Sequence, residues 1–199
     1  MFLYMSVIVT AVIILILFNS LIATSIFGTG AWHMIESVFN TFLFVVILNF
    51  ITPVVVLLLP KKWFGVNNKS FTVSNGERKF YEKIHIRKWK DKVWELGGMA
   101  GGFSKSKVAD PHSKEYIQTF IIESHKGLLD HFLRICFGFF DIILYPRYVW
   151  TVGVPVALVN VALNSMSSMV LRYNLPKLKI AYARLSKIQQ TSSEIESQN

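Results

Sequence analysis

Long apolar stretches alternate with one extended polar stretch along this chain. Apolar runs cover about residues 2–27 and 35–59, and polar residues dominate 64–114. The next stretch is polar until about Phe120 and increasingly apolar to Tyr145, and a last apolar run covers about 149–171. A run of about 20 apolar residues is long enough for a helix to cross a bilayer. The pattern therefore predicts an all-α, polytopic membrane protein with about four transmembrane spans. A mean hydropathy of +0.43 and 52% hydrophobic residues agree with this prediction.

We expect four successive regions. Residues 1–60 are predicted to form a transmembrane hairpin that turns at 28–30 and is kinked at Pro53. Residues 61–114 are predicted to form a basic interfacial region with a Gly-rich loop at 97–102. Residues 115–172 are predicted to form a second hairpin with a polar seam. Residues 173–199 are predicted to form an amphipathic helix, about 177–189, and a disordered polar tail. Within the interfacial region, residues 78–94 are predicted to form one basic helix that lies on the membrane surface.

Basic residues are concentrated on one side of the predicted spans. Fourteen of the 21 Lys and Arg residues fall between Lys61 and Lys126, against seven acidic residues, and the first 35 residues carry no charged side chain. The positive-inside rule then places 61–125, 172–199 and both termini in the cytoplasm. We expect no nucleic-acid partner, because the aromatic residues cluster in the apolar spans rather than among the charges.

The third predicted helix concentrates ionisable side chains on one face. At about 100° per residue, Glu123, Asp130, Arg134 and Asp141 lie within about 40° of one another. Ionisable groups at membrane depth usually face a cavity, a partner or a substrate path, although an interfacial helix also pairs its charges for structural reasons. Asp130 and Arg134, four residues apart, are expected to pair. His131 is the candidate general base for an alcohol, because its pKa is ordinarily near neutral.

Two cationic clusters are further candidates. The first, Arg87, Lys88, Trp89 and Lys90, suits an anionic partner at a membrane surface, and equally a solvated basic face that Trp89 anchors. The second is Arg172, Tyr173 and Asn174. If the spans pack as antiparallel neighbours, Arg172 is expected near Glu123, either as part of a site or as a structural clamp.

We expect no metal site and no cofactor. The histidines His85, His112 and His125 do not show the paired spacing with carboxylates that metal ligation requires. The single cysteine, Cys136, excludes an internal disulfide and a Cys-based zinc site, and we expect it to pack in a core.

Several short motifs occur together in a fixed order. They are Ile86-Arg87-Lys88-Trp89-Lys90 with Lys92, Gly101-Gly102-Phe103-Ser104-Lys105, Ile122-Glu123-Ser124 with His131 eight positions after Glu123, and Asn164 with Arg172-Tyr173-Asn174. Over roughly residues 80–182 the chain thereby resembles the glycosyl-4,4'-diaponeurosporenoate acyltransferase family of the staphyloxanthin-type carotenoid pathway. Lys126, Leu128 and Phe132 stand where the family pattern has Arg, Glu and Trp.

The resemblance implies a multi-pass enzyme of the bacterial cell membrane that transfers a fatty acyl group to a hydroxyl of a membrane glycolipid or glycosylated terpenoid. It implies an acyl donor such as acyl-CoA and a membrane lipid acceptor. His131 and Glu123 are the predicted catalytic residues. The predicted substrate-binding residues are Arg87, Lys88, Trp89, Lys90, Asp130, Arg134, Asn164, Arg172, Tyr173 and Asn174. The alternatives are a non-catalytic membrane protein that binds lipid or a partner, and another lipid-modifying transferase.

Overall fold

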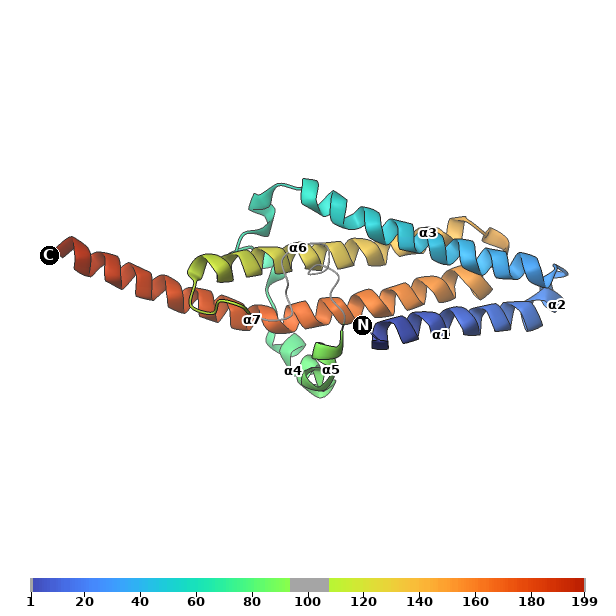
Figure 1. Ribbon diagram of the computed structural model, residues 1–199, viewed down its shortest axis with the longest axis horizontal. Coiled ribbons are helices and arrows are strands. Elements are labelled where there is room, and N and C mark those ends of the chain that lie inside the picture. The colour runs from blue at the N-terminus through green and yellow to red at the C-terminus, as the bar shows by residue number, and fades with distance from the viewer. Residues whose placement is uncertain (1, 94–107, 199) are drawn as a thin grey trace. The chain divides into compact units, whose positions relative to one another are not determined.

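The computed structural model describes residues 2–93 and 108–198, and its regular elements in these two ranges are all helical (Figure 1). The predicted all-α class is therefore confirmed. The α-helices are α1 (Phe2–Phe18), α2 (Thr24–Phe27), α3 (Ala31–Leu58), α4 (Asn75–Lys83), α5 (Ile86–Trp89), α6 (Lys114–Gly138) and α7 (Val154–Gln198). Two π-helical segments are η1 (Asn19–Ala23) and η7 (Val149–Gly153). Short 3₁₀ segments are η2 (Lys61–Phe64), η3 (Lys69–Phe71), η4 (Lys90–Lys92), η5 (Phe139–Ile143) and η6 (Pro146–Tyr148).

The chain divides into two compact units. The first unit comprises Met1–Leu58, Lys92–Trp94 and Leu129–Ser168, and the second comprises Leu59–Asp91, Glu95–Leu128 and Met169–Asn199. Helices α6 and α7 each continue from one unit into the other. Each unit is described by itself below.

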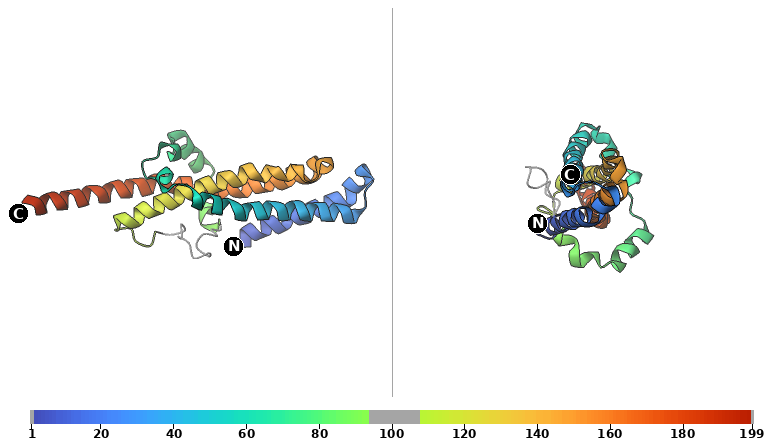
Figure 2. Two further views of the ribbon diagram at one scale, coloured as in Figure 1. Left: turned by 90° about the horizontal axis from the view of Figure 1, so that it is seen from above. Right: turned by 90° about the vertical axis from the view of Figure 1, so that its right-hand side faces the viewer.

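A helical hairpin forms the N-terminal part of the first unit. Helix α1 leads through η1 and α2 to Gly28, whose φ of 63° lies in the left-handed region that favours glycine, and the chain then reverses into α3 (Figures 1 and 2). The predicted turn at 28–30 is thus confirmed. Beside this turn, Ala23, Met34, Val38, Tyr148 and Val152 form a buried apolar cluster.

Polar side chains are buried and large apolar side chains are exposed in the first unit. The buried polar residues are Asn19, Ser37, Thr41, Thr52, Asp141, Asn160, Asn164 and Ser167. In contrast, Leu21, Phe50 and Trp150 are 72%, 70% and 81% exposed. Among the described residues, three helices are long and apolar enough to cross a membrane, namely Met5–Phe27, Ala31–Leu58 and Pro146–Ile195. This arrangement is typical of helices that expose their apolar faces to lipid and pair their polar groups inside the bundle.

An apolar core joins α6 to α7 in the second unit. It consists of Ile117, Phe120, Ile121, Leu175 and Leu178. At the N-terminus of α6, Ser113 accepts a hydrogen bond from the backbone N–H of Tyr116, so the predicted start of this helix near Ser113 is confirmed.

Five expectations were wrong, four about the limits of helices and the tail and one about the burial of Cys136. Helix α7 runs to Gln198 without a break, so the separate helix at 177–189 and the disordered tail are both overturned. Helix α6 ends at Gly138 rather than near residue 145, which leaves Asp141 in a 3₁₀ segment. The basic helix expected at 78–94 is interrupted by His85, whose φ is 51°. The Cys136 side chain is exposed rather than packed in a core. The predicted Gly-rich loop at 97–102 and the motif at 101–105 lie outside the described residues.

Candidate functional site

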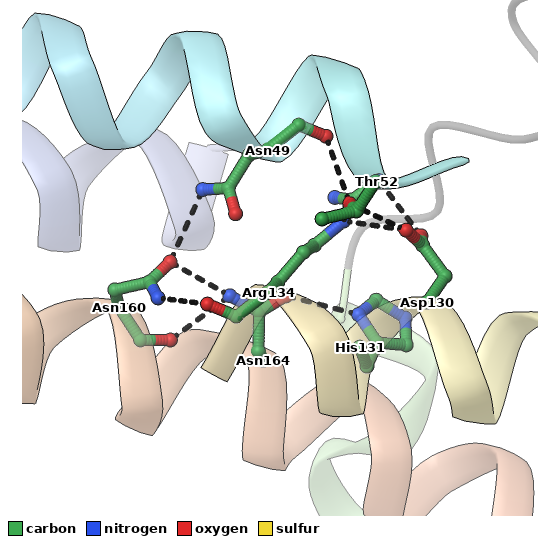
Figure 3. Close-up of polar contacts among 7 residues, drawn as sticks. All are labelled: Asn49, Thr52, Asp130, His131, Arg134, Asn160 and Asn164. Carbon is green, nitrogen blue, oxygen red and sulfur yellow. Dashed lines mark hydrogen bonds and ion pairs between the residues drawn. The ribbon is translucent and has the colours of Figure 1, made fainter. Parts of the chain in front are cut away.

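An ion pair lies between α6 and α3 in the first unit (Figure 3). The Arg134 guanidinium contacts both carboxylate oxygens of Asp130, with Nη2 2.8 Å from Oδ2 and Nε 3.1 Å from Oδ1. The Thr52 hydroxyl donates to Asp130 Oδ1 at 2.7 Å and accepts from Arg134 Nε at 3.2 Å. The predicted pairing of Asp130 with Arg134 is confirmed, and the geometry is the two-point contact that makes Arg–carboxylate pairs strong.

His131 is held by an amide from α7. Its Nδ1 lies 3.0 Å from Asn164 Oδ1. The Asn164 amide nitrogen donates to the backbone carbonyl of Asn160 at 3.0 Å, and a carbonyl only accepts, so the oxygen end of Asn164 faces the imidazole. His131 Nδ1 therefore carries the hydrogen, and the lone pair of the neutral ring is on Nε2. A ring in this tautomer is suited to accept a proton at Nε2.

A second amide on α7, Asn160, connects Asn164 to the backbone of α6. Its Nδ2 donates to the backbone carbonyl of Arg134 at 2.8 Å, and its Oδ1 accepts from Asn164 Nδ2 at 2.9 Å and from Asn49 Nδ2 at 3.1 Å (Figure 3). Helices α3, α6 and α7 thus contribute to one continuous hydrogen-bond network. Asn160 and Asn164 are 5% and 3% exposed, so these two amides are buried.

A different ion pair holds Arg172 in the second unit. The guanidinium contacts both carboxylate oxygens of Glu77, with Nη2 2.7 Å from Oε2, and Nη2 also donates to the Thr72 carbonyl at 3.1 Å. Tyr81 donates its hydroxyl hydrogen to Glu77. The hydrogen bonds from Arg172 hold the pKa of Glu77 below its usual value, whereas burial and the Glu77 carboxylate raise the pKa of Tyr81. The expected partner of Arg172, Glu123, instead pairs with Lys126 at 2.6 Å.

A basic pocket of about 310 Å³ lies beside this ion pair in the second unit. It is lined by Tyr81, Glu82, His85, Ile86, Arg87, Lys88 and Tyr173. Arg87 Nε donates to the Tyr173 hydroxyl at 2.8 Å, and Lys177 Nζ lies 4.5 Å from the centre of the Tyr173 ring. The left-handed backbone at His85 ends α4 and begins α5, so that the α5 residues Arg87 and Lys88 come to line the pocket. Cations and hydroxyls around one concavity can bind an anionic group.

Comparison with known proteins assigns the chain to a family. The sequence profile of the family described as glycosyl-4,4'-diaponeurosporenoate acyltransferase matches residues 60–184, which is more than half of the chain. The protein belongs to this family. No curated protein and no solved structure matched the chain. The activity that the family name describes is transfer of an acyl group in carotenoid biosynthesis.

The residues predicted to be catalytic or substrate-binding separate into two groups. The first unit brings together Asp130, His131, Arg134 and Asn164, and the second unit brings together Arg87, Lys88, Arg172 and Tyr173. The side chain of Lys90 forms an ion pair with Asp91, and the indole of Trp89 donates to the Ile84 carbonyl. Asn174 is half-buried on α7. Glu123 belongs to the second unit, and its role beside His131 stays a prediction.

Four residues that contact these two groups were missed from the sequence. Asn49, Thr52 and Asn160 are polar residues within apolar spans, and Asn160 lies four residues before Asn164, on the same face of α7. The four-residue spacing between Asn160 and Asn164 was the sequence feature that could have identified Asn160. Glu77 lies in the polar region among other charged residues, where the sequence offers no comparable contrast.

The buried histidine of the second unit, His125, packs against an aromatic ring and a backbone carbonyl. His125 is completely buried, stacks on Phe71 with ring centres 4.2 Å apart, and has Nδ1 3.0 Å from the Phe64 carbonyl. Among residues 2–93 and 108–198, no three His, Cys, Asp or Glu side chains gather as a metal site would require. We therefore assign His125 to the packing of the second unit.

Proposed function

We propose that this protein is a membrane-bound acyltransferase that moves a fatty acyl group onto a hydroxyl of a membrane glycolipid or glycosylated terpenoid. The observation that carries the proposal is the 3.0 Å contact between His131 and Asn164. Both residues belong to the segment that matches the acyltransferase family, and the contact supports a His131 ring with its hydrogen on Nδ1. The apolar exposure of α3 and α7 supports a location in the membrane, where such an acceptor dissolves.

His131 would act as the general base. As the acceptor hydroxyl oxygen attacks the acyl carbonyl carbon, Nε2 takes the hydroxyl proton. The bond between the acyl carbon and the carrier then breaks, and the imidazolium returns the proton to the leaving group. The products are the new ester and the protonated carrier. A positioned base contributes about 10²–10⁴-fold to such a step.

We propose that the basic pocket of the second unit binds the anionic part of the donor, such as the phosphates of acyl-CoA. Arg87 and Lys88 line it, and Tyr173 offers a hydroxyl. Arg172 bonds to Glu77 through Nε and Nη2 and to the Thr72 carbonyl through Nη2, which favours the structural clamp over direct participation in the site. We propose that Asn174, which is half-buried on α7, contacts the donor carbonyl.

Acyl transfer is tested with the purified protein, a radiolabelled acyl donor and total membrane lipid. We expect a new labelled ester with the wild type and at least a 100-fold loss of rate with His131→Gln. His112→Gln is the matched control, because His112 is an exposed histidine outside the network. Glu123→Gln tests the second predicted catalytic residue separately. Unchanged rates in both His131→Gln and Glu123→Gln would refute the assignment.

The alternatives predict different products. A non-catalytic lipid-binding protein would retain labelled lipid without forming an ester. Another lipid-modifying transferase would change phospholipids or polyprenyl lipids. Comparative lipidomics of cells with and without the protein separates these outcomes from a change confined to acylated glycolipids.

A further inference from the structure

We propose that Asn160 is a positioning residue that sets the tautomer of His131 through Asn164, and that Gly138 is required because it makes room for Asn160. This inference rests on the proposed function of His131. It adds a residue that touches neither the imidazole nor, in our mechanism, the substrate. It also assigns a role to a glycine at the end of α6.

The direction of the network is fixed at two backbone carbonyls. Asn160 Nδ2 donates to the Arg134 carbonyl at 2.8 Å, and Asn164 Nδ2 donates to the Asn160 carbonyl at 3.0 Å. A carbonyl oxygen has no hydrogen to give, so each amide must present its nitrogen there. Asn160 Oδ1 consequently faces Asn164 Nδ2 at 2.9 Å and reinforces the orientation that puts Asn164 Oδ1 toward His131.

In Asn160→Ala the backbone carbonyl of residue 160 remains, but the Asn164 amide nitrogen loses its second acceptor, Asn160 Oδ1, and its orientation is held by one hydrogen bond instead of two. If that amide turns over, its nitrogen faces the ring, Nδ1 must become the acceptor, and the hydrogen moves to Nε2. His131 then presents a donor where the mechanism needs a base. A histidine locked in the wrong tautomer loses activity even though the residue itself is present.

Gly138 gives the network its space. A Cβ atom at this position would lie 2.1 Å from Asn160 Nδ2 and 3.1 Å from Asn160 Cγ, so the amide would have to move away from the Arg134 carbonyl. Gly30 provides a matched control, because a Cβ atom there would meet nothing within 4 Å and its backbone does not have a positive φ.

The test uses the full-length protein in detergent with the histidine rings labelled with ¹⁵N. The nitrogen chemical shifts report the tautomer directly, and His131→Gln assigns the His131 signals. The variants are Asn160→Ala, Gly138→Ala, Gly30→Ala and the double variant Asn160→Ala with Asn164→Asp. The double variant is informative because a carboxylate accepts at both oxygens and needs no neighbour to orient it.

We expect the wild type and Gly30→Ala to hold the hydrogen on Nδ1. Asn160→Ala and Gly138→Ala should show a mixture of tautomers and lose at least tenfold in kcat with little change in the KM for the acyl donor. The double variant should regain the Nδ1–H form and most of kcat. Unchanged tautomer in both single variants, or a double variant that stays as impaired as Asn160→Ala, would overturn the proposal. If the wild type transfers no acyl group, the proposed function fails, while the tautomer readout still decides whether Asn160 orients the ring.

Discussion

Replacing Asp130 by Asn should destabilise the first unit more than replacing the whole ion pair by apolar residues. The Asp130 and Arg134 side chains are 13% and 16% exposed, and the carboxylate accepts from Thr52 at 2.7 Å and from Arg134 at 2.8 Å and 3.1 Å. Removing one partner of a buried pair costs roughly 3–5 kcal/mol, because the other charge stays buried alone. Because the two side chains are still partly exposed, we expect Asp130→Asn to lower the free energy of unfolding by about 3 kcal/mol, near the lower limit of this range.

The double replacement Asp130→Leu with Arg134→Leu leaves no unpaired charge and should cost about 1 kcal/mol or less. The difference of about 2 kcal/mol is about a 30-fold difference in the unfolding equilibrium. Unfolding is followed by circular dichroism as the detergent is exchanged for SDS. Asp91→Asn is the control for an ion pair whose carboxylate is 74% exposed, and it should have no measurable effect. If Asp130→Asn is as stable as the double variant, the pair does not hold α3 to α6.

Three further predictions follow from the second unit and from α6. The pKa of Glu77 is lower in the folded protein than the unfolded value of about 4.5. The ion pair with Arg172 should therefore stabilise the protein above about pH 4.5, and this stabilisation should be lost as the pH falls through the folded pKa. Denaturation at several pH values should show a smaller pH dependence of stability for Glu77→Gln than for the wild type. Arg87→Gln should raise the KM for an acyl-CoA donor about tenfold, and Lys92→Gln, outside the pocket, should not. Cys136, the single cysteine, should resist a charged maleimide in intact membranes and react after detergent is added if α6 crosses the bilayer.

The helices were predictable from the sequence because apolar runs of this length have few alternatives in a membrane. Their limits were harder to predict, and Pro176 shows why. A proline within a helix costs about 3 kcal/mol, which favoured a break. Yet Leu175 and Leu178 are 1% and 6% exposed against the α6 residues of the apolar core. Burying two such side chains contributes roughly 3–6 kcal/mol, enough to carry α7 past the proline.

The partners within the candidate site depended on contacts between distant residues. The pairing of Asp130 with Arg134 was predictable because both lie on one face of one helix. The pairing of Arg172 with Glu77 was not, because the two residues are 95 positions apart and the choice of Glu77 over Glu123 is made by the packing of the second unit. Likewise, the sequence indicated His131 and Asn164 separately, but only the structure shows their contact and the hydrogen bond between Asn164 and Asn160.

Contact of His131 with an amide rather than a carboxylate fits the position of this residue among apolar helices of the first unit. A carboxylate beside the ring would stabilise the imidazolium, but burying its charge among the apolar helices would itself cost several kcal/mol. Asn49, Asn160 and Asn164 orient the ring without adding charge, and two of their donors end on backbone carbonyls. An amide partner supports proton removal with less stabilisation of the charged ring, so the proposed mechanism depends more on correct tautomer and geometry than on electrostatic support.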